Sequence, residues 1–428
     1  MRLLFNFFAS LRLTVVLLAL SMVLIFLATL DQVDWGVYEV QHRYFQTLVA
    51  WAHYPTQFPG ASALQGLKVP LPGGFLLGGL LLVNLLCAHF RYFRAKWSKA
   101  GIALIHGGVV LLIVSGFTTA YLQQENFMWI DVGGHSNYIE SFRDVDLVLI
   151  DHTDPKEDVV VSIPSALLKP GTTIQNPALP FTLRPTDYFP NTAFFMRSEN
   201  PNMPTVKADH GVALNTAFGV ASKPFDYAKD TQNIASAVIA VDSAEGSKGT
   251  WLVSTLFDGK ETPPFLAKNL PQTFTVGGHT WEMTLRPRRE YLPYTIYLDK
   301  FIHETYPASN VPKRYESQVR LVNLAAHEDR QVFIYMNHPL RYQGLTFFQA
   351  SFAPGDTSSM LQVVRNPGWL LPYFSVAIVG LGLCVQFLLS FIKHLRSERA
   401  PATVSATATA SYPARRAAPR EPVAAPRP

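Results

Sequence analysis

The stretch KAGIALIHGGVVLLIVSG, Lys99–Gly116, decides how this chain is built. Apart from Lys99 it is apolar or small, and with the residues up to Tyr121 it reaches the roughly 20 residues that cross the hydrocarbon core of a bilayer. It also carries one titratable side chain, His106. Ionisable residues inside membrane segments are rare and usually functional. The stretch therefore predicts both a membrane helix and a site within it.

Three further apolar runs accompany this one in a chain of 428 residues that is 48% hydrophobic and only 16% charged. We expect four membrane spans, at Leu13–Leu30, Gly73–His89, Gly101–Tyr121 and Trp369–Ile392. The predicted domains are residues 1–30 (N-terminus and first span), 31–72 (outer loop), 73–121 (second and third spans with a basic loop), 122–368 (outer β domain), 369–392 (fourth span) and 393–428 (disordered tail).

Basic residues orient the four spans. Arg2 and Arg12 precede the first span, a basic loop joins the second to the third, and Lys393 and Arg396 follow the fourth. The loop holds Arg91, Arg94, Lys96 and Lys99. With four spans these groups share one side, which the positive-inside rule assigns to the cytoplasm. Residues 31–72 and 122–368 are then outside.

The large outer segment shows the pattern of β structure. Short runs rich in β-branched residues are separated by turn residues, and alternating residues flank Gly277-Gly278 as in a hairpin. We expect a sandwich or a barrel. Residues from Ala400 onward are rich in Ala, Pro, Arg and Thr without periodicity, which is typical of a disordered tail.

The third span has two different faces. Gly101, Gly108 and Ser115 recur every seven residues and form a stripe of small side chains, which lets helices approach closely. His106 lies about 160° around the helix from Gly108. The face that packs tightly is therefore not the face that carries the imidazole. In the second span, we expect Asn84 to hydrogen-bond another helix.

His106 has a functional and a structural interpretation. It is either an axial ligand to a metal or haem, or part of a proton path, or a neutral histidine that only packs. His89 ends the second span in the same leaflet, so a bis-histidine site and a solvated interfacial His89 are both open. Arg91, Arg94 and Lys99 suit the propionates of a haem, although the topology alone accounts for them.

Several classes of function leave no trace in the sequence. Nucleic-acid motifs, Walker A, GxSxG and HExxH patterns are absent, and the net charge is a mild +5. The two cysteines, Cys87 and Cys384, form no CxxC pair, and the outer histidines lack metal-ligand spacing. In YMNHPLRYQGLTFFQASF, His338 is expected first as a turn residue and second as a haem or partner contact.

Taken together, these segments resemble the ResB family of cytochrome c assembly proteins, the membrane route called System II. The resemblance runs from about Leu3 to Leu389 and includes SLRLTVVLLAL, VYEVQHRYF, NLLCAHFRYFRAKWSKAGIALIHGGVVLLIVSG, PKRYESQVRLV and FIYMNHPLRYQGLTFFQASF. The first outer loop departs from it, because ATLDQVDWG replaces the family's Gly-Thr…Pro-Gln pattern.

The resemblance implies a place in the bacterial inner membrane, with both termini cytoplasmic and the large domain periplasmic. It implies that haem b is the transported substrate, that a partner of the CcsA/ResC type carries a tryptophan-rich haem segment, and that haem is attached to CxxCH motifs of apocytochrome c. His106 matches the family's membrane histidine. The chain has no catalytic constellation of its own, so attachment would belong to the complex. The alternative is a membrane-anchored scaffold or sensor with a β binding domain and no haem.

Overall fold

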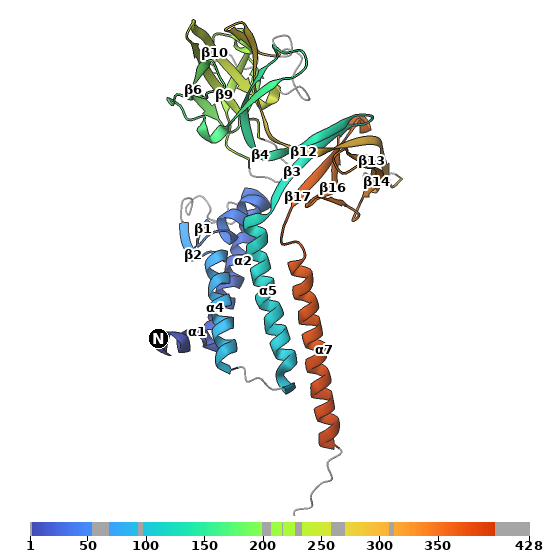
Figure 1. The fold of residues 1–428 in the computed structure, drawn as a ribbon. Helices are drawn as coiled ribbons and strands as arrows, with labels where there is room; N and C mark the ends of the chain where they lie inside the picture. The colour runs from blue at the N-terminus through green and yellow to red at the C-terminus, as the bar shows by residue number, and fades with distance from the viewer. Residues whose placement is uncertain are drawn as a thin grey trace, which may run out of the picture.

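Membrane helices and β structure occupy separate parts of this molecule (Figure 1). The computed structural model describes residues 2–53, 68–92, 97–198, 207–215, 217–226, 233–257, 270–307 and 312–398. Within them, four helices are long and apolar enough to cross a membrane: α2 (Leu11–Val40), α4 (Gly74–Tyr92), α5 (Ala100–Leu122) and α7 (Leu371–Glu398). Most of the remaining elements are strands. The predicted fold class, four membrane helices with a large mainly-β domain, is confirmed.

The ends of two helices differ from the prediction. Helix α2 runs ten residues beyond Leu30, into the segment expected to be an outer loop. Helix α7 continues through Lys393 to Glu398, where straight-chain residues favour helix and cations suit its C-terminal end. The expected tail therefore begins as helix, and residues 399–428 lie outside the described residues.

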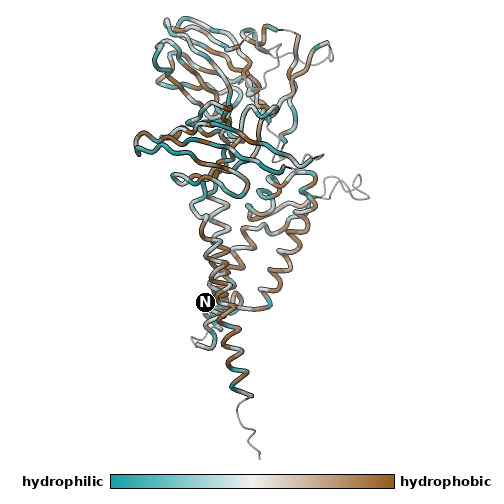
Figure 2. The backbone as a smooth tube through the Cα atoms, turned by 90° about the vertical axis from the view of Figure 1, so that its right-hand side faces the viewer, coloured by the Kyte–Doolittle hydropathy of each residue, from teal (hydrophilic) through white to brown (hydrophobic). Residues whose placement is uncertain are grey.

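The membrane helices form a row rather than a closed bundle. Helix α4 packs between α2 and α5, and α5 packs between α4 and, much more extensively, α7. Figure 2 shows hydrophobic residues along most of their length. A separate short helix, α1 (Arg2–Phe8), precedes α2 and contacts α4.

The small residues of α5 make its close contact with α7. Gly101, Gly108 and Ser115 are the buried residues of α5. A Cβ atom on Gly108 would lie 2.6 Å from Val379 Cγ2 and 2.9 Å from the carbonyl oxygen of Ser375. No side chain fits there without moving α7, so the predicted packing stripe is confirmed.

The chain bends after the membrane part of α2, and we call residues 36–45 of this bend the elbow. At Gly36 the backbone takes φ 71°, which glycine adopts without strain, and the helix kinks. The chain then passes through a π-helical turn, Gln41–Phe45, into the hairpin of β1 (Val49–His53) and β2 (Lys68–Pro72). Helix and elbow thus replace much of the expected loop.

The β region has two lobes, which share the long strands β4 (His135–Asp151) and β12 (His279–Thr305) (Figure 1). The proximal lobe adds β3 (Gln124–Asp131), β13 (Pro312–Asn323), β14 (Glu328–Tyr335), β15 (Leu340–Tyr342), β16 (Leu345–Phe352) and β17 (Ser358–Arg365). Its core includes Ile139, Ile296 and Phe347. Strands β14 and β15 stand at the two ends of the strand order, and β14 contacts both β15 and β16, so the sheet curls back on itself.

The distal lobe is built on the other ends of β4 and β12. It adds β5 (Val159–Pro164) and β11 (Thr273–Val276) to that sheet. A second sheet has the order β10–β9–β6 (Gly246–Ser254, Ser236–Ser243, Phe181–Phe189), and β7 (Thr192–Met196) pairs with β8 (Phe218–Ser222). The hairpin predicted at Gly277-Gly278 is confirmed, with Val276 opposite His279.

The two lobes meet where β4 and β12 bend. The pairing of these strands shifts register between Pro287 and Arg289 and again between Tyr291 and Ile296. Such irregularities bend a strand and increase its twist.

Short helical turns lie at Trp97–Lys99, Ser165–Leu167, Gly211–Leu214, Thr255–Phe257 and Pro354–Asp356.

Replacing Gly108 with leucine should destabilise the helix row. The new side chain meets Val379 and Ser375 and forces α5 and α7 apart, an overpacking that typically costs about 1–3 kcal/mol. We expect a lower midpoint of thermal unfolding for the full chain in detergent, measured as loss of monodisperse protein after heating.

The matched control is Gly107→Leu. A Cβ atom on Gly107 meets no atom within 4 Å, and the substitution brings the same gain in helix propensity. Equal midpoints for the two variants would contradict close packing at Gly108.

Candidate functional site

The structure brings the two membrane histidines together. His106 lies in the second turn of α5, and His89 lies near the end of α4. Their ring centroids are 5.8 Å apart with the ring planes at 85°. Both side chains are half-buried. Because α5 turns Gly108 toward α7, His106 faces α4, as the separation of the two faces predicted.

The histidine pair lies at one end of the line of contact between α4 and α5, which we call the α4–α5 seam. At the other end, Phe75 stacks on Tyr121 with centroids 5.0 Å apart and also contacts Phe117. The two helices are therefore joined by ring contacts at both ends, and the histidines lie at the end that borders the basic loop.

The basic residues take different places around this end. Lys99 is exposed immediately before α5, and Arg91 is exposed in the last turn of α4. The Arg91 guanidinium donates a 2.7 Å hydrogen bond to Asn6 Oδ1 and lies over the Tyr92 ring. Arg94 lies outside the described residues.

Two buried polar residues hold segments of the membrane part together through hydrogen bonds. Asn84 is 1% exposed; it accepts a 2.6 Å hydrogen bond from Thr14 Oγ1 and donates one of 2.6 Å to the carbonyl of Phe8. The predicted bond from Asn84 to another helix is confirmed. Asp31, 3% exposed, accepts a 2.5 Å hydrogen bond from the Tyr44 hydroxyl and ties the elbow to α2.

Sequence reasoning missed the role of Asp31. The position of this carboxylate directly after an apolar run predicts the start of an outer loop. The available signal was its isolation, because an acidic side chain at a helix end in the membrane needs a partner within the protein. That partner, Tyr44, is thirteen residues away and is reached only because the chain kinks at Gly36.

Several histidines of the β region lie within hydrogen-bond distance of carboxylates. Among the described residues, no three His, Cys, Asp or Glu side chains could hold a metal ion. His279 Nδ1 lies 2.7 Å from Asp151 Oδ2. His338 follows a tight turn with Asn337 at φ 61°, and its ring stacks on Tyr335, so its expectation as a turn residue is confirmed.

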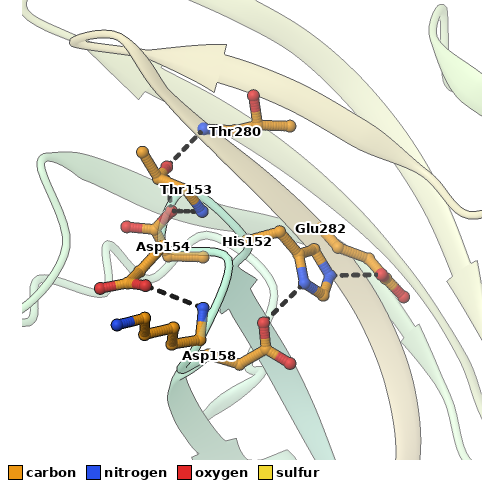
Figure 3. Close-up of polar contacts among 8 residues, drawn as sticks. His152, Thr153, Asp154, Asp158, Thr280 and Glu282 are labelled. Carbon is orange, nitrogen blue, oxygen red and sulfur yellow. Dashed lines mark hydrogen bonds and ion pairs between the residues drawn. The ribbon is translucent and has the colours of Figure 1, made fainter.

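His152 bridges two carboxylates in the distal lobe (Figure 3). Its Nδ1 lies 2.8 Å from Asp158 Oδ1, before β5, and its Nε2 lies 2.9 Å from Glu282 Oε2, in β12. A neutral imidazole has one N–H, so only the protonated ring donates both bonds. The bonds to Glu282 and Asp158 raise the pKa of His152 above its usual value. The bridge therefore ties the β4–β5 turn to β12 as a charged group.

Stability at this bridge should fall as the pH rises. Because the folded pKa of His152 is raised, its contribution is complete below the unfolded value of 6.5 and is lost as the pH rises through the folded pKa. We expect His152→Gln to increase amide hydrogen exchange between Asp151 and Val159 below pH 6.5. The increase should reach at most about fivefold, since exposed pairs contribute up to about 1 kcal/mol.

The difference between this variant and the wild type should shrink toward alkaline pH. His327→Asn, in the exposed β13–β14 turn, is the matched control and should leave these amides unchanged. A difference that persists unaltered at high pH would contradict the charged bridge.

Part of this sequence is similar to a known protein family. The model of the ResB-like family matches residues 239–366, which run from β9 to β17 and include most strands of the proximal lobe. Protein NrfI of Wolinella succinogenes is 31% identical over 107 residues. That match covers 25% of this chain and 12% of NrfI, so the chain spans a small part of that relative. Residues 239–366 of this chain are therefore similar to the ResB-like family.

Proposed function

We propose that this protein is the haem-handling membrane subunit of a cytochrome c assembly complex. The observation that carries the proposal is the His89–His106 pair, placed between two membrane helices beside the basic loop. In this function haem b is the cargo, and the chain moves it toward the β region together with a partner of the CcsA/ResC type. The family match supports the pathway, and the histidine pair supports the cargo.

His106 has the chemistry of an axial haem ligand. Neutral imidazole is a normal ligand to haem iron, and the His106 side chain is half-buried in a membrane helix. The tight α5–α7 contact fixes the helix face that carries it. The donor set therefore fits haem.

A partner is proposed to supply the second ligand. Helix α7 packs against the face of α5 that carries Gly101 and Gly108, and both histidines on the α4 side remain partly exposed. A second membrane protein has room to bring its own histidine there. His89 is the alternative second ligand, because the same seam places it beside His106.

Charge supports an orientation for this transfer. Arg91, Lys99, Lys393 and Arg396 lie at the helix ends away from the β region (Figure 1). The positive-inside rule assigns these ends to the cytoplasm and the β region to the periplasm. Haem would then be taken up in the cytoplasmic leaflet. Periplasmic apocytochrome c would meet the β region, and thioether formation would belong to the complex.

Removing the imidazole of His106 should empty the site. We expect His106→Ala to lower the haem content of the purified complex with its partner by about tenfold or more, since even outer-shell partners of metal ligands are worth 10–100-fold. The measurement is the haem absorbance per protein and the yield of holocytochrome c. Added imidazole should restore part of the absorbance.

His394→Ala in α7 is the matched control, and it should leave the haem content unchanged. His89→Ala distinguishes the two second ligands, because a six-coordinate spectrum persists only if the partner supplies that ligand. Full haem occupancy and cytochrome yield in His106→Ala would refute the ligand role.

A further inference from the structure

The short helix α1 (Arg2–Phe8) is apolar on nearly every side. Its sequence is RLLFNFF, and none of its residues is buried. Leu3 is 84% exposed, Leu4 62% and Phe7 56%. In water, seven residues do not form a stable helix, because nucleation costs more than so few hydrogen bonds return. At 1.5 Å per residue the helix is about 10 Å long, far too short to cross a bilayer.

Polar contacts with α4 fix the position of α1. The Asn84 amide donates to the carbonyls of Phe8, at 2.6 Å, and of Ser10, at 3.2 Å. Asn6, the uncharged polar residue of α1, accepts a 2.7 Å hydrogen bond from Arg91 at its Oδ1 atom. Asn84 and Arg91 lie on either side of His89 along α4, so α1 is held at the level of the histidine pair.

The direction of α1 differs from that of the membrane helices. It projects sideways from the row near the ends that carry the basic loop (Figure 1). Its exposed leucines and phenylalanines continue the apolar surface of α2, where Leu11 and Val15 are also exposed. Arg2 and Arg91 border the same region and suit anionic headgroups.

We propose that α1 lies in the interfacial layer of the bilayer and holds the end of α4 at a fixed depth. The occupant of its apolar surface is phospholipid, at the boundary between headgroups and acyl chains, where such helices enter by about 5–10 Å. Through Asn84 and Arg91 the anchor sets the depth of His89, and through the ring contact that of His106. The inference depends on the membrane spans and not on haem.

Site-directed spin labelling of the full chain tests this placement. The two native cysteines are replaced by alanine, and single labels are placed at Leu3→Cys and Phe7→Cys in nanodiscs of phosphatidylcholine and phosphatidylglycerol. Labels at Val15, in α2, and at Leu324, in the β13–β14 turn, serve as lipid and water references. We expect the oxygen-to-nickel accessibility ratios of Leu3 and Phe7 to fall between the two references, closer to Val15.

A ratio equal to that of Leu324 would overturn the proposal, because α1 would then face water. Low accessibility to both reagents would also overturn it, because α1 would then be covered by protein.

The effect on depth is tested separately with a label at Phe90, which is exposed on α4 one residue from His89. Combining Leu3→Ser and Phe7→Ser should shift the Phe90 label toward higher nickel accessibility. A label at Val376, in α7, is the control and should not change. An unchanged Phe90 label would refute the depth-setting role.

Discussion

The close contact between α5 and α7 determines how the rest of the molecule is arranged. Where Gly108 meets Val379 and Ser375, neither helix can rotate without a clash. Helix α5 leads directly into β3, and β17 leads into α7. These two strands pair from Gln124 opposite Arg365 to Asp131 opposite Ser358. A helix pair in the membrane and a strand pair outside it thus form one continuous structure, on which the proximal lobe is built.

Polar groups in the membrane part divide into two kinds. Asn84 and Asp31 are almost fully buried and bond to partners within the chain, as groups without water require. The histidine pair is only half-buried and lies where α4 meets α5. The first kind holds the helices together. The second keeps part of its surface exposed.

The sequence predicted what short-range patterns encode. Apolar runs located the four helices, a seven-residue repeat identified the packing face of α5, and glycines at 277 and 278 identified a hairpin. The His89–His106 contact followed from two helices joined by a short loop. The elbow did not, because the Asp31–Tyr44 bond depends on the kink at Gly36. The division of the β region into two lobes was not predicted either. Strands β4 and β12 each run through both lobes, and their pairing joins residues more than 100 positions apart in the sequence.

The shared strands also fix the sequence in which the two cores become complete during synthesis. Every residue of the distal core lies between Leu147 and Leu285, whereas the proximal core runs from Met128 to Val363. The distal lobe is thus an insertion within the proximal one, and its core is fully synthesised some eighty residues before the proximal core. Helix α7 follows both cores in the chain. The membrane row therefore acquires its tightest contact only after both lobes have been synthesised.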